Sequence, residues 1–330
     1  MSNPVNKERA HLVKEPILRS IIFIAVKYIS MILGRKISQR LGLVKFSVHY
    51  ITKTVILDPE KLIAMDGYQP KKQDVFVATY FKSGTNWMLQ IAQQIADYGD
   101  STFEHIHDVV ANPEAGVYPD LNVKPVYQSP SGLRVIKTHQ SAPYIPYNES
   151  AKYLVVLRSP KEVLVSSYHF FCGILNVLPY ISFEEWAEIF MAQDSLLDRW
   201  IEHTSSYWAW RDRSNVYVVK FDQLKKQPEE EIKTIIALLE IPLNEQQLAQ
   251  VIERASFKYM KTQQDKFAPA RSPFIAKDKT TNMMRKGEAG SKEAADHAAL
   301  LASIDKICQQ KLDHMGSDFP YAEWFLPPPK

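Results

Sequence analysis

Cysteine, charge of one sign and long uninterrupted apolar runs are all scarce in this 330-residue chain. Its two cysteines, Cys172 and Cys308, form no CxxC pair or Cys/His cluster, which argues against a zinc site or a disulfide framework. We expect two small buried side chains in a reducing compartment, and no bound metal. The net charge of +3 is too small to suggest nucleic acid as a partner, and a compact anion held by a few cations fits it equally well.

A GxxxxGK[ST] motif is also absent, so an ordinary P-loop kinase or ATPase loses its main support. There is no internal repeat and no low-complexity linker. Strand-like and helix-like segments instead alternate from Asp74 to about Leu239, which predicts one α/β domain with a central parallel β-sheet flanked by helices. The expected strands begin in KKQDVFVATY and continue over Leu133–His139, Lys152–Arg158 and Asn215–Phe221. Helices are expected over residues 86–98, 161–171, within 182–213 and over 228–240.

The most apolar segment, Pro16–Lys36, lies near the N-terminus and is interrupted by Lys27. It starts too far along the chain, and lacks the small-residue cleavage site, for a signal peptide. With 3.6 residues per turn, Arg19, Lys27 and two serines, Ser20 and Ser30, share one arc of about 100°. Two arrangements stay open, a helix in a membrane interface and a helix packed on protein, with a true span less favoured. Residues 1–70 are therefore treated as an N-terminal extension with an amphipathic helix, and residues 71–330 as the main domain.

The stretch VATYFKSGTNWMLQIAQQIADY, Val77–Tyr98, is typical of a strand, a tight turn and an amphipathic helix. Free N–H groups and the dipole at a helix start bind anions, and Gly84 allows close approach of the backbone. Lys82 adds a positive charge, and Trp87 offers a face on which a base could stack. Side-chain donors follow from Ser83, Thr85 and Asn86. Alone, the stretch would also fit a strand followed by a serine-capped helix.

Three further stretches carry cations or a histidine at the ends of expected elements. Arg158 ends a strand and Ser166 follows two helical turns later, a spacing at which a guanidinium and a hydroxyl can hold a second phosphate. In VIKTHQS, Lys137 and His139 alternate toward the carboxyl end of a strand, where α/β sheets place their ligands. A histidine there can accept a proton at neutral pH. The last stretch, MMRKGEAG, offers Arg285, Lys286 and Gly287.

In order and spacing, these four stretches resemble the cytosolic sulfotransferase family, over about Asp74 to Gly290. The resemblance implies a P-loop-NTPase-like sulfotransferase fold. It also implies transfer of a sulfuryl group from 3′-phosphoadenosine 5′-phosphosulfate (PAPS) to an alcohol, phenol or amine, which leaves 3′-phosphoadenosine 5′-phosphate (PAP). No metal is required by the residues present.

Residue by residue, the resemblance assigns His139 as general base, Lys137 as its assistant and Lys82 to the bridging oxygen of the leaving group. It places Trp87 and Phe257 against adenine, with Phe221 where the family usually has a tyrosine. The resemblance assigns binding of the 5′-phosphate to Ser83, Gly84, Thr85 and Asn86. It assigns binding of the 3′-phosphate to Arg158, Ser166, Arg285, Lys286 and Gly287. Candidate contacts to the acceptor are Phe81, His107, Tyr144 and Phe170.

The chain also departs from the family pattern. Phe81 and Asn86 replace a usual proline and threonine, and Ser291–Glu293 replaces Asp-Trp-Lys. The dimerisation pattern is not recognisable in Lys292–Ser303, so the oligomeric state stays open. Lys266–Gly290 is long enough for a functional lid or a disordered loop.

Two other functions remain alternatives to a sulfotransferase. One is a nucleotide kinase-like phosphotransferase of related fold. The other is a non-catalytic, membrane-associated nucleotide-binding protein, against which His139 beside Lys82 argues. We expect a small-molecule acceptor, no nucleic acid, and a cytoplasmic protein with peripheral membrane contact through residues 16–36 as an open option. The acceptor could be a steroid, phenol, lipid alcohol, glycan or alkaloid.

Overall fold

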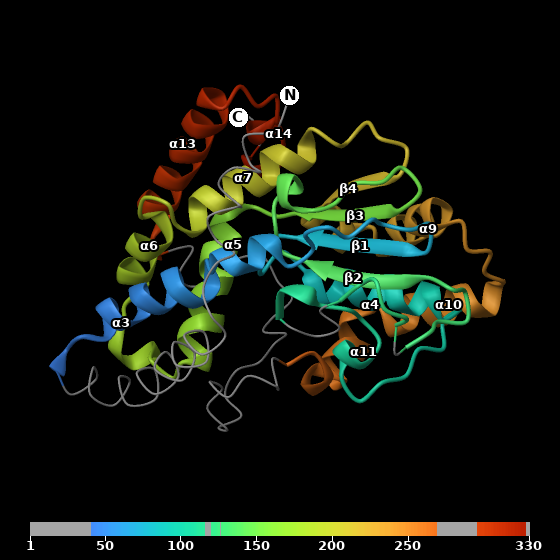
Figure 1. The fold of residues 1–330 in the computed structure, drawn as a ribbon. Helices are drawn as coiled ribbons and strands as arrows, with labels where there is room; N and C mark the ends of the chain where they lie inside the picture. Colours follow the sequence, from blue (N-terminus) through green and yellow to red (C-terminus); the bar gives the residue numbers. More distant parts are fainter. Residues whose placement is uncertain (1–40, 116–119, 126, 269–295, 328–330) are drawn as a thin grey trace.

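The computed structural model describes residues 41–115, 120–125, 127–268 and 296–327 (Figure 1). The amphipathic segment Pro16–Lys36 and three of the phosphate candidates, Arg285, Lys286 and Gly287, lie outside these residues.

A single parallel sheet in the order β2-β1-β3-β4 forms the centre of the described chain. Its strands are β1 (Asp74–Thr79), β2 (Arg134–Thr138), β3 (Lys152–Leu157) and β4 (Val216–Lys220). Ala78 pairs with Thr138 on one side and Val155 on the other, so neighbouring strands end at the same edge. The four predicted strands are confirmed, except that β4 stops at Lys220 and Phe221 begins a helix.

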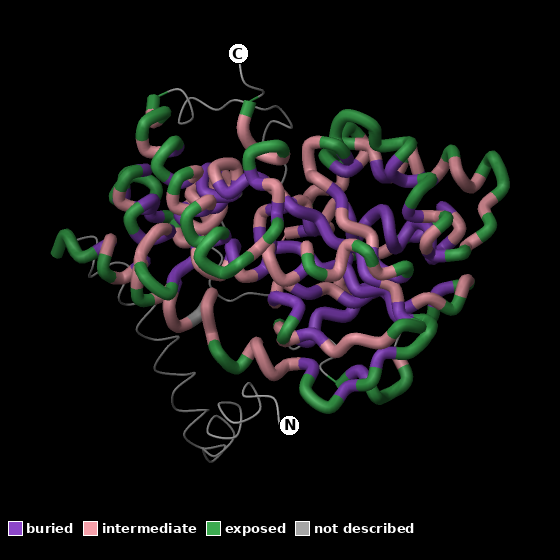
Figure 2. Tube along the Cα trace, turned by 90° about the horizontal axis from the view of Figure 1, so that it is seen from above, coloured by how far each residue is buried: buried purple, intermediate pink, exposed green. Residues whose placement is uncertain are grey.

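Helices cover both faces of the sheet and make a three-layered α/β domain (Figure 1). Val75 and Val77 of β1 pack into one apolar layer, whereas the alternating Phe76 and Ala78 pack into the other. The first layer holds α4 (Thr85–Ala96), α9 (Pro228–Leu239), α10 (Glu245–Arg254) and α11 (Phe257–Thr262). The second holds α3 (Val44–Ile51), α5 (Pro160–Ser167), α6 (Phe183–Met191), α7 (Leu196–Trp208), α13 (Ala298–His314) and α14 (Tyr321–Phe325). Figure 2 shows buried segments through the middle and exposed residues on outer loops and helices.

Several helix boundaries follow from local chemistry. Pro160 and Pro228 occupy the first turns of α5 and α9, where the missing N–H of proline costs nothing. The helix predicted over residues 161–171 ends at Ser167 and continues as a π-helical turn, η6 (Tyr168–Cys172). Helix α8 (Phe221–Lys226) was not predicted, because six residues are too few to show a helical period. Both cysteines are buried and free, as expected.

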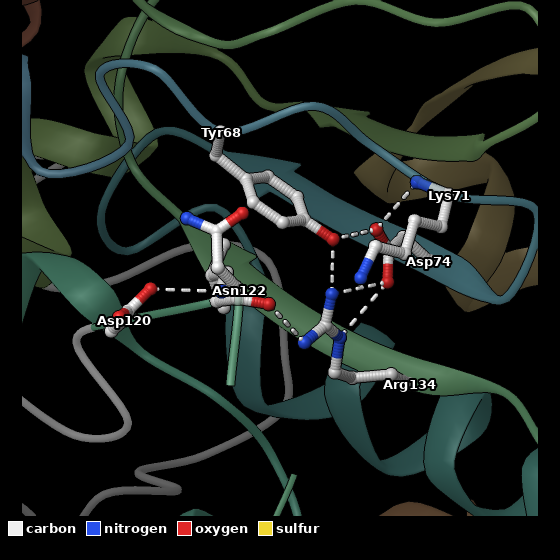
Figure 3. Close-up of polar contacts among 7 residues, drawn as sticks. Tyr68, Lys71, Asp74, Asp120, Asn122 and Arg134 are labelled. Carbon is white, nitrogen blue, oxygen red and sulfur yellow. Dashed lines mark hydrogen bonds and ion pairs between the residues drawn. The ribbon is translucent and has the colours of Figure 1, made fainter. Parts of the chain in front are cut away.

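A buried polar cluster joins the amino ends of β1 and β2, at the opposite edge from the strand ends named above (Figure 3). The Arg134 guanidinium lies 2.8 Å from a carboxylate oxygen of Asp74, and both side chains are buried. Tyr68 donates its hydroxyl to Asp74 and accepts from Arg134, while the Lys71 N–H lies 2.8 Å from Asp74 Oδ2. Arg134 also donates to the Leu121 carbonyl at 2.7 Å. The cluster therefore ties β1 to β2 and to the segment after residue 120.

Asp74→Ala should lower the free energy of unfolding by about 3–5 kcal/mol, because it leaves the Arg134 charge buried without its partner. Urea unfolding of the full chain measures this loss. The control is Asp100→Ala, whose ion pair with Arg254 is exposed and should be worth less than about 1 kcal/mol. Equal losses for the two variants would contradict a structural role for the buried pair.

Candidate functional site

The loop from Tyr80 to Gly84 joins β1 to α4 and turns the chain through two left-handed residues, Lys82 (φ 62°) and Gly84 (φ 94°). A Cβ on Gly84 would lie 2.7 Å from ring atoms of Phe221, so the position requires glycine both for its φ and for its space. No side chain caps the start of α4. The first N–H groups of that helix, which have no intrahelical partner, are therefore available to an anion.

Gly84→Ala should weaken nucleotide binding by at least about tenfold, because the added Cβ must displace Phe221 and strain the loop. Calorimetric titration of the full chain with PAP measures the affinity. Gly132→Ala is a matched control, since Gly132 has φ +80° but open space around it. Similar losses in both variants would show that only backbone strain matters, and would count against the close packing at Gly84.

The predicted phosphate donors lie together at this turn. The Ser83 side chain is buried, and its Oγ has no hydrogen-bond partner among the described residues. An unsatisfied buried hydroxyl is costly, so this oxygen is a candidate partner for a water or a polar ligand. The Thr85 hydroxyl lies 2.7 Å from that of Thr79, at the end of β1. The Asn86 amide donates to the Phe267 carbonyl at 3.3 Å, which fixes the loop to the segment after α11.

Arg158, which follows the last residue of β3, contacts this loop directly. Its Nη1 donates to the Lys82 carbonyl at 2.6 Å, and its Nε donates to Glu162 at 3.0 Å. Its guanidinium carbon lies 4.4 Å from the centre of the Phe221 ring, which in turn packs on Gly84. The other predicted member of the phosphate pair, Ser166, is half-buried on α5.

The two predicted base-stacking residues are brought to the same side of the sheet. The indole N–H of Trp87 donates to the Ala255 carbonyl at 2.8 Å, two residues before Phe257 at the start of α11. Phe257 is 43% exposed, an unusual position for phenylalanine and one from which its ring can meet a ligand. The Trp87 ring also meets the edge of Phe221 at 5.9 Å between ring centres.

His139 follows the last residue of β2. Its Nδ1 lies 2.7 Å from the Thr79 carbonyl oxygen, and because a carbonyl only accepts, Nδ1 carries the proton. The neutral ring then presents Nε2 as a proton acceptor. Enclosure by protein and the neighbouring Lys137 charge hold the pKa of His139 well below its usual value, so the ring is neutral at physiological pH. The side chain is half-buried, which leaves an edge accessible.

Two lysines accompany this histidine. Burial lowers the pKa of Lys137 to about 8, an effect that the Glu114 carboxylate partly opposes. The Lys82 ammonium lies 3.8 Å from the centre of the Phe170 ring.

Glu114, which the sequence did not single out, contacts the catalytic candidates. Both of its carboxylate oxygens lie 3.1 Å from the His139 backbone nitrogen. The Thr138 hydroxyl also donates to it. No local motif marks this residue, because it belongs to a short loop turn 25 residues before His139.

The acceptor candidates separate into two groups. Phe81 and Phe170 both pack against Phe171, with ring centres 5.4 and 5.2 Å apart, and form an aromatic wall beside Lys82. Phe171 was not predicted, although it follows Phe170 directly. Tyr144 instead contacts Arg199 and Glu202 of α7, and the His107 ring lies 3.4 Å from the Asn112 amide.

Within the described part of the chain, no helix combines the length and apolar character needed to cross a membrane. Among the same residues, no group of three or more His, Cys, Asp or Glu side chains could hold a metal ion.

Comparison with known proteins gives consistent matches. A family model described as a sulfotransferase domain matches residues 72–316. Human Sulfotransferase 1C2 is 24% identical over 265 residues, covering 77% of this chain and 88% of that protein. Mouse Sulfotransferase 1B1 is 30% identical over 208 residues, covering 60% and 68%.

Among solved structures, a retinol dehydratase in complex with androsterone and the inactive cofactor PAP superposes with a TM-score of 0.61. The two share 18% identity, and the match covers 80% of this chain and 87% of that one. Mouse sulfotransferase SULT7A1 complexed with PAP gives a TM-score of 0.58 at 22% identity, covering 77% and 90%. These structural likenesses support the fold described above.

Proposed function

Because the chain belongs to the sulfotransferase family, we propose that it transfers a sulfuryl group from PAPS to a hydroxyl, or an amine, of a small organic acceptor. One observation carries the proposal. The Thr79 carbonyl, at the end of the strand that leads into the Lys82–Gly84 loop, holds His139 Nδ1–H and leaves Nε2 to take a proton. A base is thereby fixed to the same strand end that supplies the anion-binding turn.

The residues at the turn suit a nucleotide that carries a 5′-phosphosulfate. The buried hydroxyl of Ser83 and the uncapped start of α4 provide donors. Gly84 keeps the turn left-handed and packed against Phe221. In the proposed arrangement, Thr85 and Asn86 complete the 5′-phosphate contacts, and Trp87 and Phe257 hold the base. Arg158 and Ser166, with Arg285, Lys286 and Gly287 from outside the described residues, hold the 3′-phosphate. PAPS supplies an activated sulfo group, joined to phosphate through a bridging oxygen.

The proposed reaction is an in-line displacement. The acceptor oxygen attacks sulfur as His139 Nε2 takes its proton, a new S–O bond forms, and the bond from sulfur to the bridging oxygen breaks. Lys82 stabilises the charge that develops on the bridging oxygen, and Lys137 stabilises the oxygens of the sulfo group. Positioned charges of this kind lower the barrier because they are aligned before the reaction.

An acceptor screen with PAPS as donor tests this function, read by mass spectrometry for a gain of one sulfo group. The aromatic wall of Phe81, Phe170 and Phe171 favours apolar acceptors with one hydroxyl. Solved retinol dehydratase structures contain androsterone and retinol, so steroids and retinoids begin the screen, with sugars as the contrasting class. A sulfated sugar without a sulfated apolar alcohol would contradict the proposed acceptor class.

We also propose that the N-terminal extension, residues 1–70, contacts a membrane surface. Lys45 and Lys53 fix α3 and the turn that follows it to Glu188 and to the carbonyls of Gln193 and Asp194. Leu43, just before α3, and Phe46 and Tyr50 within it are exposed. From Pro16 to Leu57 the sequence has seven Lys or Arg residues and no Asp or Glu. A basic, apolar segment of this kind suits an anionic lipid surface.

Phe46→Ser, in the full chain, should reduce flotation with vesicles of phosphatidylserine and phosphatidylcholine several-fold, because it removes the most exposed apolar ring of α3. Tyr180→Ser, at another exposed aromatic residue, is the control. Vesicles of phosphatidylcholine alone should bind less. Unchanged flotation of Phe46→Ser, or no flotation of the wild type, would contradict the contact.

A further inference from the structure

We propose that Glu114 is the positioning residue of this site: its carboxylate fixes the main chain that carries His139 and places a negative charge beside Lys137. The inference rests on the proposed function, which gives His139 and Lys137 their roles. It goes beyond that function by assigning a residue that touches neither donor nor acceptor in the proposed mechanism.

Pairing with β2 positions the loop that carries Glu114. Ala111, which lies outside the four strands, forms an isolated parallel bridge with Ile136 of β2. Its N–H donates to the Val135 carbonyl at 3.0 Å, and its carbonyl accepts from the Lys137 N–H at 2.8 Å. The chain then enters the turn η4 (Pro113–Ala115). This bridge sets the register of the loop against β2, so the Glu114 side chain arrives where β2 ends.

At that point the carboxylate holds two consecutive residues. The His139 N–H points at both oxygens, and the Thr138 hydroxyl donates to Oε1. Thr138 Oγ1 in turn accepts from the Gln140 N–H at 3.1 Å. The Gln140 carbonyl is itself held by the Tyr207 hydroxyl at 3.1 Å. The main chain on both sides of His139 is therefore tied to Glu114, directly or through Thr138.

This arrangement divides the control of His139 between two groups. The Thr79 carbonyl orients the ring through Nδ1, and Glu114 fixes the backbone from which the ring projects. The Thr138 hydroxyl and the His139 N–H both donate to Glu114, and an ionised carboxylate, which only accepts, suits these two contacts. Loss of Glu114 would leave the ring bond in place but would free the main chain. Small displacements of a reacting group cost rate rather than affinity.

The charges around Lys137 give a second consequence. Glu114 supports the protonated form of Lys137, whereas burial and the ammonium of Lys61 oppose it. The other titratable groups nearby are His139, which also senses Lys61 and the buried His203, and Tyr207, whose pKa is raised by burial and by the Glu114 charge. Burial also raises the pKa of Glu114 itself, and its hydrogen bonds from Thr138 and His139 oppose that effect. Lys137 can stabilise sulfo oxygens only while protonated. With a pKa of about 8, Lys137 should set the alkaline limb of the pH–activity profile, where activity falls as the lysine loses its proton. Removal of the Glu114 charge should move that limb to lower pH.

The test compares three variants of the full chain by steady-state kinetics over pH. Glu114→Gln should lower kcat about tenfold to a hundredfold, with little change in KM for PAPS, and move the alkaline limb by about one pH unit. Thr138→Val should lower kcat but leave the limb in place, because the charge stays. Glu185→Gln removes another carboxylate that accepts a backbone N–H, at the start of α6, and should change neither quantity.

The outcomes separate this inference from the proposed function. Wild-type kcat and an unmoved limb in Glu114→Gln would overturn the role of Glu114, even if His139→Ala is inactive. A wild type with no sulfo transfer would overturn the proposed function itself. If Glu114→Gln fails to fold, Glu114→Asp decides instead: it keeps the charge but shortens the side chain. The limb should then stay while kcat falls, and full wild-type kcat would contradict the positioning role.

Discussion

His139→Ala should lower kcat by about 10²–10⁴-fold, the usual effect of removing a general base, while PAP affinity stays within about twofold. The reason is geometric. The His139 ring bonds the Thr79 carbonyl at the end of β1, and Thr79 is not one of the residues assigned to the nucleotide. Its pKa lies well below the ordinary range, so the wild-type ring is a neutral base throughout neutral pH. Activity should consequently fall on the acid side only at low pH, as the ring becomes protonated.

Single-turnover kinetics and calorimetry with PAP separate the two effects. His314→Ala, at the exposed end of α13, is the control and should change neither. Retained turnover in His139→Ala would remove the base from the mechanism. Loss of PAP binding in that variant would show that His139 acts in nucleotide binding instead.

Arg158→Ala should weaken binding of PAP about tenfold to a hundredfold, in line with the loss of charge-assisted hydrogen bonds to a phosphate. The same substitution should weaken adenosine 5′-phosphate, which lacks the 3′-phosphate, to a smaller extent. A small common loss is expected because Arg158 also bonds the Lys82 carbonyl and covers Phe221. The difference between the two nucleotides measures the proposed 3′-phosphate contact.

Arg211→Ala is a matched control for this measurement. Arg211 likewise pairs with a carboxylate, Asp318, and covers an aromatic ring, Trp208, but far along the chain from the turn. Its loss should affect neither nucleotide. Equal weakening of PAP and adenosine 5′-phosphate by Arg158→Ala would restrict Arg158 to a structural role in the loop.

Local sequence chemistry predicts the sheet and the tight turn at Lys82–Gly84 well. The runs that form β1 and β3 are apolar on both faces, which only a sheet covered on both sides explains. The turn at Lys82–Gly84 is marked by a glycine, and the left-handed conformation there is the physical reason for that residue. His139 was placed by the rule that parallel sheets gather their functional groups at the carboxyl ends of strands.

Contacts between distant segments could not be predicted in this way. Glu114 reaches His139 only because Ala111 bridges β2, and no periodicity in that loop indicates such pairing. The hydrogen bond from the Asn86 amide to the Phe267 carbonyl also has no local signal in the sequence. Likewise, the packing of Phe221 on Gly84 joins segments more than a hundred residues apart. Such relations depend on tertiary structure rather than on local pattern.

The central claim is that the group transferred is a sulfo group from PAPS, and double labelling tests it most directly. One sample receives PAPS with radioactive sulfur in the sulfo group, and another receives ATP with a radioactive terminal phosphate, each with the same mixture of apolar alcohols. We predict that radioactive sulfur appears on an acceptor, that phosphorus does not, and that His139→Ala abolishes most of the signal. Transfer of phosphorus, or of neither label, would contradict the account.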